Sequence, residues 1–237
     1  MRDYCDCEQS SSKNYPKWSS IDVLWWKSFG GSDYLNKYKD GYILFHKEKI
    51  KEIASQYKIP AILLALVART EAGGMPDYFK YNVLMARQFD YLGNDWMDNN
   101  LTITSRPEKT SMGVIAMQIR IVAKIFGKDP KNLSHTEIIY ISNCLQKDNF
   151  NLTMVAQHLY DLIKYDYPKN NTLYLTDEQL IVVGSRYNRG TQRNFSDFIS
   201  SINAKEGTLE REWTSYGRSM LKYKERVMRL LYGNVAK

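Results

Sequence analysis

The stretch Pro60-Ala-Ile-Leu-Leu-Ala-Leu-Val-Ala-Arg-Thr-Glu71-Ala-Gly-Gly74 is the most apolar part of the chain and decides its fold class. A helix that is apolar on nearly every face belongs in a protein core. Proline is tolerated in a first helical turn, where its missing N–H does no harm, and glycines commonly follow a helix end. We therefore predict a central, buried helix from Pro60 to about Glu71, ended by Gly73 and Gly74.

Helical periodicity continues along most of the remaining sequence. Apolar residues repeat at helical spacing over 111–126, and capping boxes at 134–137 and 176–179 mark two further helix starts. Residues 75–110 are instead rich in Asp, Asn and aromatic residues, and we expect them to be irregular. The alternation in Leu101-Thr-Ile-Thr104 predicts one short hairpin strand. The expected class is mainly α (α+β), with a small β element near residue 100.

The domain organisation follows from composition. Residues 1–20 are polar, and we expect a loose arm there, while 21–41 are rich in aromatic residues and predict short helical segments. No internal repeat or linker divides the rest, and a length of 237 residues suits one or two domains. We therefore expect an N-terminal arm and aromatic-rich helical extension over 1–45, followed by one domain over 46–237.

Apolar content and net charge exclude several classes of protein. The longest apolar stretch, 59–68, is shorter than the about 20 residues that cross a bilayer, so we do not expect an integral membrane protein. Residues 1–9 lack an apolar segment, so we expect synthesis in the cytoplasm without a signal peptide. A net charge of +7 favours a polyanionic partner, which is nucleic acid, an anionic membrane surface or an acidic cell-wall polymer.

Cysteine and histidine usage predicts neither a metal nor a cofactor. The three cysteines, Cys5, Cys7 and Cys144, are too few for a disulfide scaffold, and they lack zinc-ligand spacing. We expect Cys144 to be a small buried apolar residue rather than a nucleophile. The three histidines are far apart, and the chain has no glycine-rich phosphate loop.

Glu71 is the residue whose position points to chemistry. A carboxylate at the C-terminal end of a helix is unfavourable against the helix dipole, and Ala72, Gly73 and Gly74 leave space beside this one. A carboxyl group held against apolar walls has a raised pKa, which is what a general acid needs. A merely solvated charge at a helix end is the alternative interpretation.

Three further segments follow Glu71 in a characteristic order. They are Ser111-Met-Gly113-Val-Ile-Ala-Met117-Gln118-Ile119, Asn151-Leu-Thr-Met-Val-Ala156-Gln-His-Leu159 and Ser185-Arg-Tyr187-Asn188-Arg-Gly190. In order and spacing, over about residues 48–200, they resemble the goose-type lysozyme and soluble lytic transglycosylase family of the lysozyme-like superfamily. The resemblance implies a lysozyme-like helical domain, with a small, partly β lobe over about 75–110 that forms the other wall of a substrate cleft.

The resemblance also implies roles for single residues. Glu71 falls on the family's catalytic glutamate, and Met117 and Gln118 fall on a pair that lines the cleft beside the scissile bond. Tyr187 and Asn188 fall on a pair that packs and hydrogen-bonds near the acid. Met117 packing in the core, Gln118 capping backbone groups and Tyr187 ending a helix in water are the alternatives for these positions.

The sequence departs from the family pattern in several places. Ala72 replaces the usual Ser, Ile115-Ala116 replace Gly-Leu, and Arg189 replaces Ala. A long insertion also separates Glu71 from Gln118. These departures affect the expected substrate contacts more than the acid.

The implied activity is cleavage of the β-1,4 bond between N-acetylmuramic acid (MurNAc) and N-acetylglucosamine (GlcNAc) by a lytic transglycosylase or lysozyme (muramidase). The implied partner is the peptidoglycan glycan strand, without a cofactor, and nucleic acid is not expected. Without a signal peptide, such an enzyme resembles a phage endolysin or an antibacterial effector that acts in the periplasm or cell wall of a target cell. An effector implies an immunity protein or a secretion-system component as a further partner.

Two alternatives to this enzyme and one question of mechanism stay open. The alternatives are a catalytically inactive lysozyme-like binding or structural protein, and a basic helical nucleic-acid-binding protein that only the charge supports. A hydrolase needs a second carboxylate, for which Asp90 and Asp95 are the first candidates, before Asp98 and Glu108. A lytic transglycosylase manages with one glutamate, and we favour this single-carboxylate site.

Overall fold

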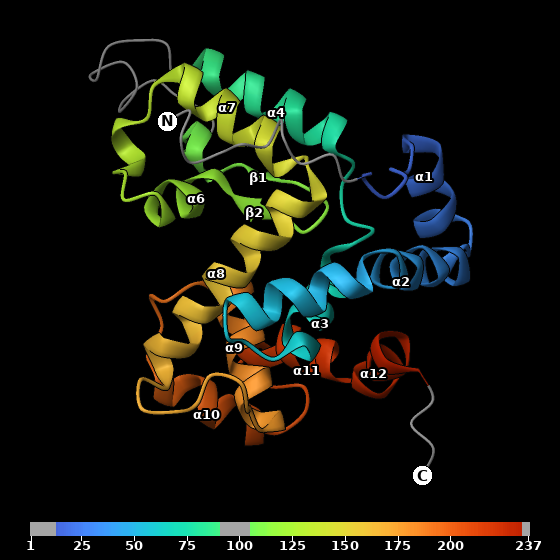
Figure 1. Cartoon of the computed structure of the whole chain (residues 1–237), viewed down its shortest axis with the longest axis vertical. Coiled ribbons are helices and arrows are strands. Elements are labelled where there is room, and N and C mark those ends of the chain that lie inside the picture. The colour runs from blue at the N-terminus through green and yellow to red at the C-terminus, as the bar shows by residue number, and fades with distance from the viewer. Residues whose placement is uncertain (1–12, 91–104, 234–237) are drawn as a thin grey trace. The chain divides into compact units, whose positions relative to one another are not determined.

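The computed structural model describes residues 13–90 and 105–233, and over these the chain is mainly helical, as predicted (Figure 1). The only sheet among the described residues has two strands. The elements, with η for a short 3₁₀ helix, are α1 (Ser20–Ser28), α2 (Ser32–Gln56), α3 (Ala61–Glu71), α4 (Asp77–Asp90), η1 (Pro107–Lys109), β1 (Ser111–Met112), β2 (Met117–Gln118), α6 (Ile119–Ile125), η2 (Pro130–Asn132), α7 (His135–Leu145), α8 (Asp148–Asp166), α9 (Asp177–Arg189), α10 (Phe195–Asn203), η3 (Arg211–Thr214), α11 (Ser215–Leu221) and α12 (Lys224–Tyr232).

The chain forms two compact units. Unit 1 holds the residues up to Tyr38 and Glu71–Met154, and unit 2 holds Lys39–Thr70 and the chain from Val155 onward. The boundaries between the units fall within α2, before the last residue of α3 and within α8. The expected division after residue 45 lies inside α2 and stays a prediction.

The predicted central helix is confirmed as α3. Its residues 63–69 are buried, and the helix ends at Glu71, before Gly73 and Gly74. Because a fully buried leucine contributes about 1.5–3 kcal/mol, the three buried leucines of α3 anchor the core of unit 2. None of the helices in the described residues has both the length and the apolar character to cross a membrane.

The C-terminal half of unit 2 is built around the contact between α9 and α11, with α10 and η3 packed beside them. A Cβ atom on Gly217 would lie 2.0 Å from the backbone oxygen of Ile181, so only glycine permits this approach of the two helices. The capping box predicted for α9 is present, because the side chain of Thr176 accepts the N–H of Gln179.

Unit 1 contains the antiparallel pair β1–β2, with α6, α7 and α4 beside it. Ser111 pairs with Gln118 and Met112 with Met117. Helix α4 packs against β1 and η1, and α6 packs against β2 and α7. The capping box predicted for α7 is present, formed by Ser134 and Glu137.

The expectation that 75–110 is irregular was wrong for α4. Over residues 77–88, the part of α4 whose side chains the structure describes, the buried positions are Lys80, Leu84 and Gln88, while the apolar Val83 and Met85 are exposed. Because polar residues occupy two of three buried positions, the usual apolar periodicity is absent from the sequence. The strand expected at 101–104 lies outside the described residues.

The prediction of a helix over 111–126 was also wrong for the first half of this range. Gly113 has a φ of +84°, which ends any regular helix, and the chain forms the β1–β2 hairpin here before α6 begins at Ile119. A small β element is therefore present at residues 111–118, where the sequence predicted a helix.

Two expectations about the N-terminal part and the cysteines also change. Residues 13–19 are not a loose arm, because the N–H of Tyr15 donates to Asp148 and the carbonyl of Pro16 accepts from the hydroxyl of Tyr38. Cys144 is buried as expected, and it is disulfide-bonded, which the cysteine count did not predict.

Candidate functional site

Glu71 lies at the point where a buried helix ends. It is half-buried, its backbone carbonyl accepts the N–H of Gly74 at 3.0 Å, and the neighbouring Ala72 is fully buried. The carboxylate therefore stands at the boundary between the apolar helix end and the turn that leads into α4. This is the position that the sequence predicted for a general acid.

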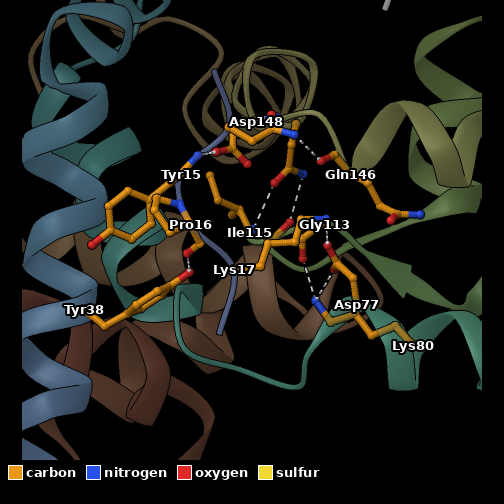
Figure 2. Close-up of polar contacts among 12 residues, drawn as sticks. Tyr15, Pro16, Lys17, Tyr38, Asp77, Lys80, Gly113, Ile115, Gln146 and Asp148 are labelled. Carbon is orange, nitrogen blue, oxygen red and sulfur yellow. Dashed lines mark hydrogen bonds and ion pairs between the residues drawn. The ribbon is translucent and has the colours of Figure 1, made fainter. Parts of the chain in front are cut away.

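A buried lysine that follows Glu71 in the chain is hydrogen-bonded to the β1–β2 hairpin. Lys80 is 8% exposed, and its ammonium donates to the carbonyl oxygen of Gly113 and lies 3.7 Å from Oδ1 of Asp77 (Figure 2). Burial lowers the pKa of Lys80, while the charges of Asp77 and Glu71 oppose this shift. The ammonium is thus hydrogen-bonded to the hairpin and ion-paired with Asp77, and the charge of Glu71 also favours its protonated form.

The hairpin is clamped from the other side by the start of α8. Oδ1 of Asn151 accepts the N–H of Ile115 at 2.9 Å, and its Nδ2 donates to the Ile115 carbonyl at 3.0 Å. A Cβ atom on Gly113 would lie 2.5 Å from the carbonyl oxygen of Leu145 and 2.7 Å from Nδ2 of Asn151. The glycine is therefore required both by its positive φ and by this close approach.

The two hairpin residues singled out from the sequence have different environments. Met117 is 1% exposed and belongs to the core of unit 1. Gln118 is half-buried, and its Oε1 accepts from Nε of Arg120 at 2.6 Å. Of the pair, Gln118 is the one with a polar group near the surface of the hairpin.

Tyr187 and Asn188 belong to unit 2, near the end of α9. The ring of Tyr187 is half-buried and lies 5.8 Å from the ring of His158 and 6.5 Å from that of Tyr216, whereas Asn188 is exposed. Because Glu71 belongs to unit 1, the approach of Tyr187 and Asn188 to Glu71 stays a prediction.

A buried ion pair holds this end of α9 in place. The guanidinium of Arg186 donates twice to Asp166, at 2.8 Å each, and the two side chains are 0% and 1% exposed. Arg186 also donates to the carbonyl of Arg193 at 2.6 Å and lies 4.4 Å from the ring centroid of Phe198. The arginine thus ties the residues around Tyr187 to α8 and to the loop before α10.

The candidates for a second carboxylate are only partly described. Asp95 and Asp98 lie outside the described residues, as does the side chain of Asp90, the last residue of α4. Glu108 lies in η1 and is 7% exposed. Its distance from Glu71 stays untested.

Sequence reasoning missed a pocket of about 220 Å³ in unit 1. Its mainly apolar lining comes from the segment before α1, from α2 and from the start of α4, and includes Lys17, Trp18, Tyr38, Met75, Tyr78 and Lys80. The only sequence signal was the Asp77–Lys80 pair, spaced by three residues directly after Pro76, which favours a helix start with a charged face.

Within residues 13–90 and 105–233, no three His, Cys, Asp or Glu side chains are grouped so that they could hold a metal ion. No model of a known protein family, no curated protein and no solved structure shows a significant match to this chain.

Proposed function

We propose that the chain is a peptidoglycan-cleaving glycosidase, a lytic transglycosylase or muramidase that acts on the MurNAc-β-1,4-GlcNAc bond. One observation carries the proposal. Glu71, the 111–119 hairpin and the first residues of the 151–159 helix are far apart in the sequence, yet all belong to unit 1, where Asn151 is hydrogen-bonded to Ile115 and Lys80 to Gly113. These are three of the four segments on which the resemblance to the lytic transglycosylase family rests.

Glu71 is the proposed general acid. It protonates the glycosidic oxygen while positive charge develops on the sugar ring, as in glycosidases with paired or single carboxyl groups. The ammonium of Lys80 interacts favourably with the carboxylate that remains after the proton has left. In the single-carboxylate mechanism that we favour, this carboxylate then accepts the proton of the MurNAc 6-hydroxyl as that oxygen attacks.

The charge and the disulfide are consistent with a site of action at the cell wall. A net charge of +7 favours association with an anionic polymer. Disulfides persist in oxidising compartments such as the periplasm and are rare in the cytosol, and Cys144 is disulfide-bonded. We therefore propose action in the periplasm or cell wall of a target cell, as an endolysin or as an antibacterial effector with an immunity protein or secretion-system component as partner.

The test is digestion of purified peptidoglycan, with mass spectrometry of the soluble products. We expect disaccharide-peptides cut between MurNAc and GlcNAc, with 1,6-anhydro ends if the single-carboxylate mechanism operates. Folded protein that releases no glycan fragments would refute the activity and favour a non-catalytic binding protein. Cleavage only of peptide bonds would place the protein in another enzyme class.

A further inference from the structure

A cavity of about 310 Å³ lies in unit 2, lined by the loop that follows α10 and by η3 and α11. Its lining is mainly polar and includes three basic side chains, those of Arg211, Arg218 and Lys222. None of these residues takes part in the proposed glycosidase reaction. The cavity therefore needs a separate explanation.

The three basic side chains lie on one face of η3 and α11. Together with Ser215 they recur every three or four residues, and residues at this spacing are neighbours on a helix surface. Ser215 and Ser219 add two hydroxyl groups to the same lining. Cations and hydroxyl donors are thus gathered around one cavity.

Both guanidinium groups are held in place by neutral acceptors. Nη1 of Arg211 donates to the carbonyls of Ile202 and Ala204, at 3.1 and 2.7 Å, at the C-terminal end of α10. Nη1 of Arg218 donates to the hydroxyl of Thr214. Because a guanidinium has five N–H donors, each arginine keeps donors for a further acceptor. The two groups are oriented before any ligand binds, which lowers the entropic cost of binding.

The positive charges at the cavity are not neutralised by close contacts. Among the residues that the structure describes, neither guanidinium forms an ion pair, and neither does the ammonium of Lys222. Burial and the charge of Arg211 lower the pKa of the Arg218 guanidinium, while the charges of Glu212 and Glu206 oppose this shift. An anion placed between these like charges would stabilise them.

The two carboxylates limit the size of this anion. Glu206 and Glu212 line the cavity, and both are exposed. Solvent screens their charges more than those of the half-buried arginines, but they repel the flanking charges of an extended polyanion. The cavity therefore suits a compact anion better than a nucleic-acid strand or another anionic polymer.

The number of donors favours phosphate over a carboxylate. A terminal phosphate group presents three strong acceptor oxygens, and arginine binds it through paired N–H groups. A carboxylate has only two oxygens for the guanidinium, ammonium and hydroxyl donors that line the cavity. We infer that the cavity lined by Arg211, Arg218 and Lys222 binds the phosphate group of a small phosphate monoester or of inorganic phosphate. This binding is independent of the proposed cleavage of peptidoglycan.

The test is an amide NMR titration of the full-length protein with inorganic phosphate, glycerol phosphate and acetate at constant ionic strength. We expect saturable shifts at η3 and α11 with both phosphate compounds, and severalfold weaker binding of acetate. Tighter binding of glycerol phosphate would identify small phosphate esters as the ligands, and tighter binding of inorganic phosphate would identify the free ion. A single-stranded oligonucleotide should not displace inorganic phosphate.

Single substitutions in the lining should change the affinity in opposite directions. Arg218→Gln removes a cation and should weaken phosphate binding about tenfold. Lys222→Gln, at an exposed position, should weaken it about two- to fivefold. Glu206→Gln removes a repelling charge and should strengthen it about two- to fivefold, which damage to the fold would not do. The matched control is Arg229→Gln, which removes the same charge from an exposed position of α12 outside the lining.

Absence of saturable shifts at η3 and α11, or binding of acetate as tight as that of phosphate, would overturn the inference. An equal loss of affinity in Arg218→Gln and Arg229→Gln proteins would also overturn it, because net charge rather than the cavity would then attract the anion. If Arg218→Gln protein does not fold, the opposite effects of Lys222→Gln and Glu206→Gln decide. Displacement of phosphate by the oligonucleotide would reject a site for a compact anion and indicate a nucleic-acid interface.

Discussion

The side-chain amide of Asn151 pairs with both backbone groups of Ile115, accepting its N–H at 2.9 Å and donating to its carbonyl at 3.0 Å. The two residues are 36 positions apart, and Asn151 is fully buried. A helix start thus supplies the hydrogen bonds that the turn between β1 and β2 cannot make internally. The turn is rigid because its backbone is satisfied from outside.

Replacing Asn151 by Ala should therefore destabilise unit 1. Two hydrogen bonds are lost, and a buried N–H and C=O of Ile115 are left unpaired, which together costs about 2–4 kcal/mol. Urea unfolding followed by circular dichroism measures the loss. Asn143→Ala on the exposed face of α7 is the control and should change stability by less than about 0.5 kcal/mol. A similar small effect of Asn151→Ala would show that the clamp is not needed.

We predict a larger loss of stability when the buried ion pair between Arg186 and Asp166 in unit 2 is broken. Asp166→Ala leaves a fully buried guanidinium without its carboxylate, and breaking such a pair costs about 3–5 kcal/mol. We also expect faster amide hydrogen exchange around Tyr187, because Arg186 holds that helix end. Asp161→Ala, an exposed position on the same helix, is the control. Unchanged exchange at Tyr187 in the Asp166 variant would contradict this anchoring role.

Glu137 should make stability depend on acid pH. The hydrogen bond from Lys128 and those from Ser134 lower its pKa from 4.5 to about 2. A carboxyl group with a lowered folded-state pKa stabilises the fold above pH 4.5, and this contribution is lost as the pH falls toward about 2. Between pH 4.5 and about 2, the free energy of unfolding should therefore fall less in Glu137→Gln protein than in the wild type. The same pH dependence of the free energy of unfolding in both proteins would contradict the prediction. Glu225→Gln, at an exposed position of α12, is the control.

The parts of the fold that the sequence predicts are those decided by local rules. An apolar run with a proline before it and glycines after it is enough to locate α3, and capping boxes locate α7 and α9. Helix α4 was missed because Lys80 and Gln88 occupy its buried face. The environment that makes a buried lysine acceptable, a carbonyl of Gly113 and the charge of Asp77, is assembled only by the fold.

The candidate site, like the fold, is predicted from the sequence only in part. The order of segments predicts that Glu71 and residues 111–119 belong to one site, and in the structure both lie in unit 1, where Lys80 is hydrogen-bonded to Gly113. Apart from the Asp77–Lys80 pair, the sequence does not predict the pocket at Trp18, because Trp18, Tyr38 and Tyr78 share no spacing rule and meet only through tertiary contacts. Long-range pairs such as Arg186 with Asp166 are hidden for the same reason.

Glu71→Gln should remove activity while leaving the fold intact. The amide keeps the size and the hydrogen bonding of the carboxyl group but has no transferable proton, so cleavage of peptidoglycan should fall by at least about a hundredfold. Turbidity loss of cell-wall suspensions measures the rate, and circular dichroism checks folding. Glu225→Gln should cleave at the wild-type rate. Near-normal lysis by folded Glu71→Gln protein would end the assignment of Glu71 as the acid.

How the reaction ends depends on whether a second carboxylate takes part. A retaining hydrolase needs one about 5–5.5 Å from the acid and an inverting one about 6.5–9.5 Å away. For a single-carboxylate transglycosylase we expect 1,6-anhydro-MurNAc ends and near-normal activity in Asp90→Asn, Asp95→Asn and Glu108→Gln proteins. Lys80→Met should then slow cleavage, because the ammonium that interacts with Glu71 is gone. Reducing MurNAc ends, together with loss of lysis in one folded Asp→Asn protein, would instead identify that aspartate as the residue that activates water or attacks the sugar.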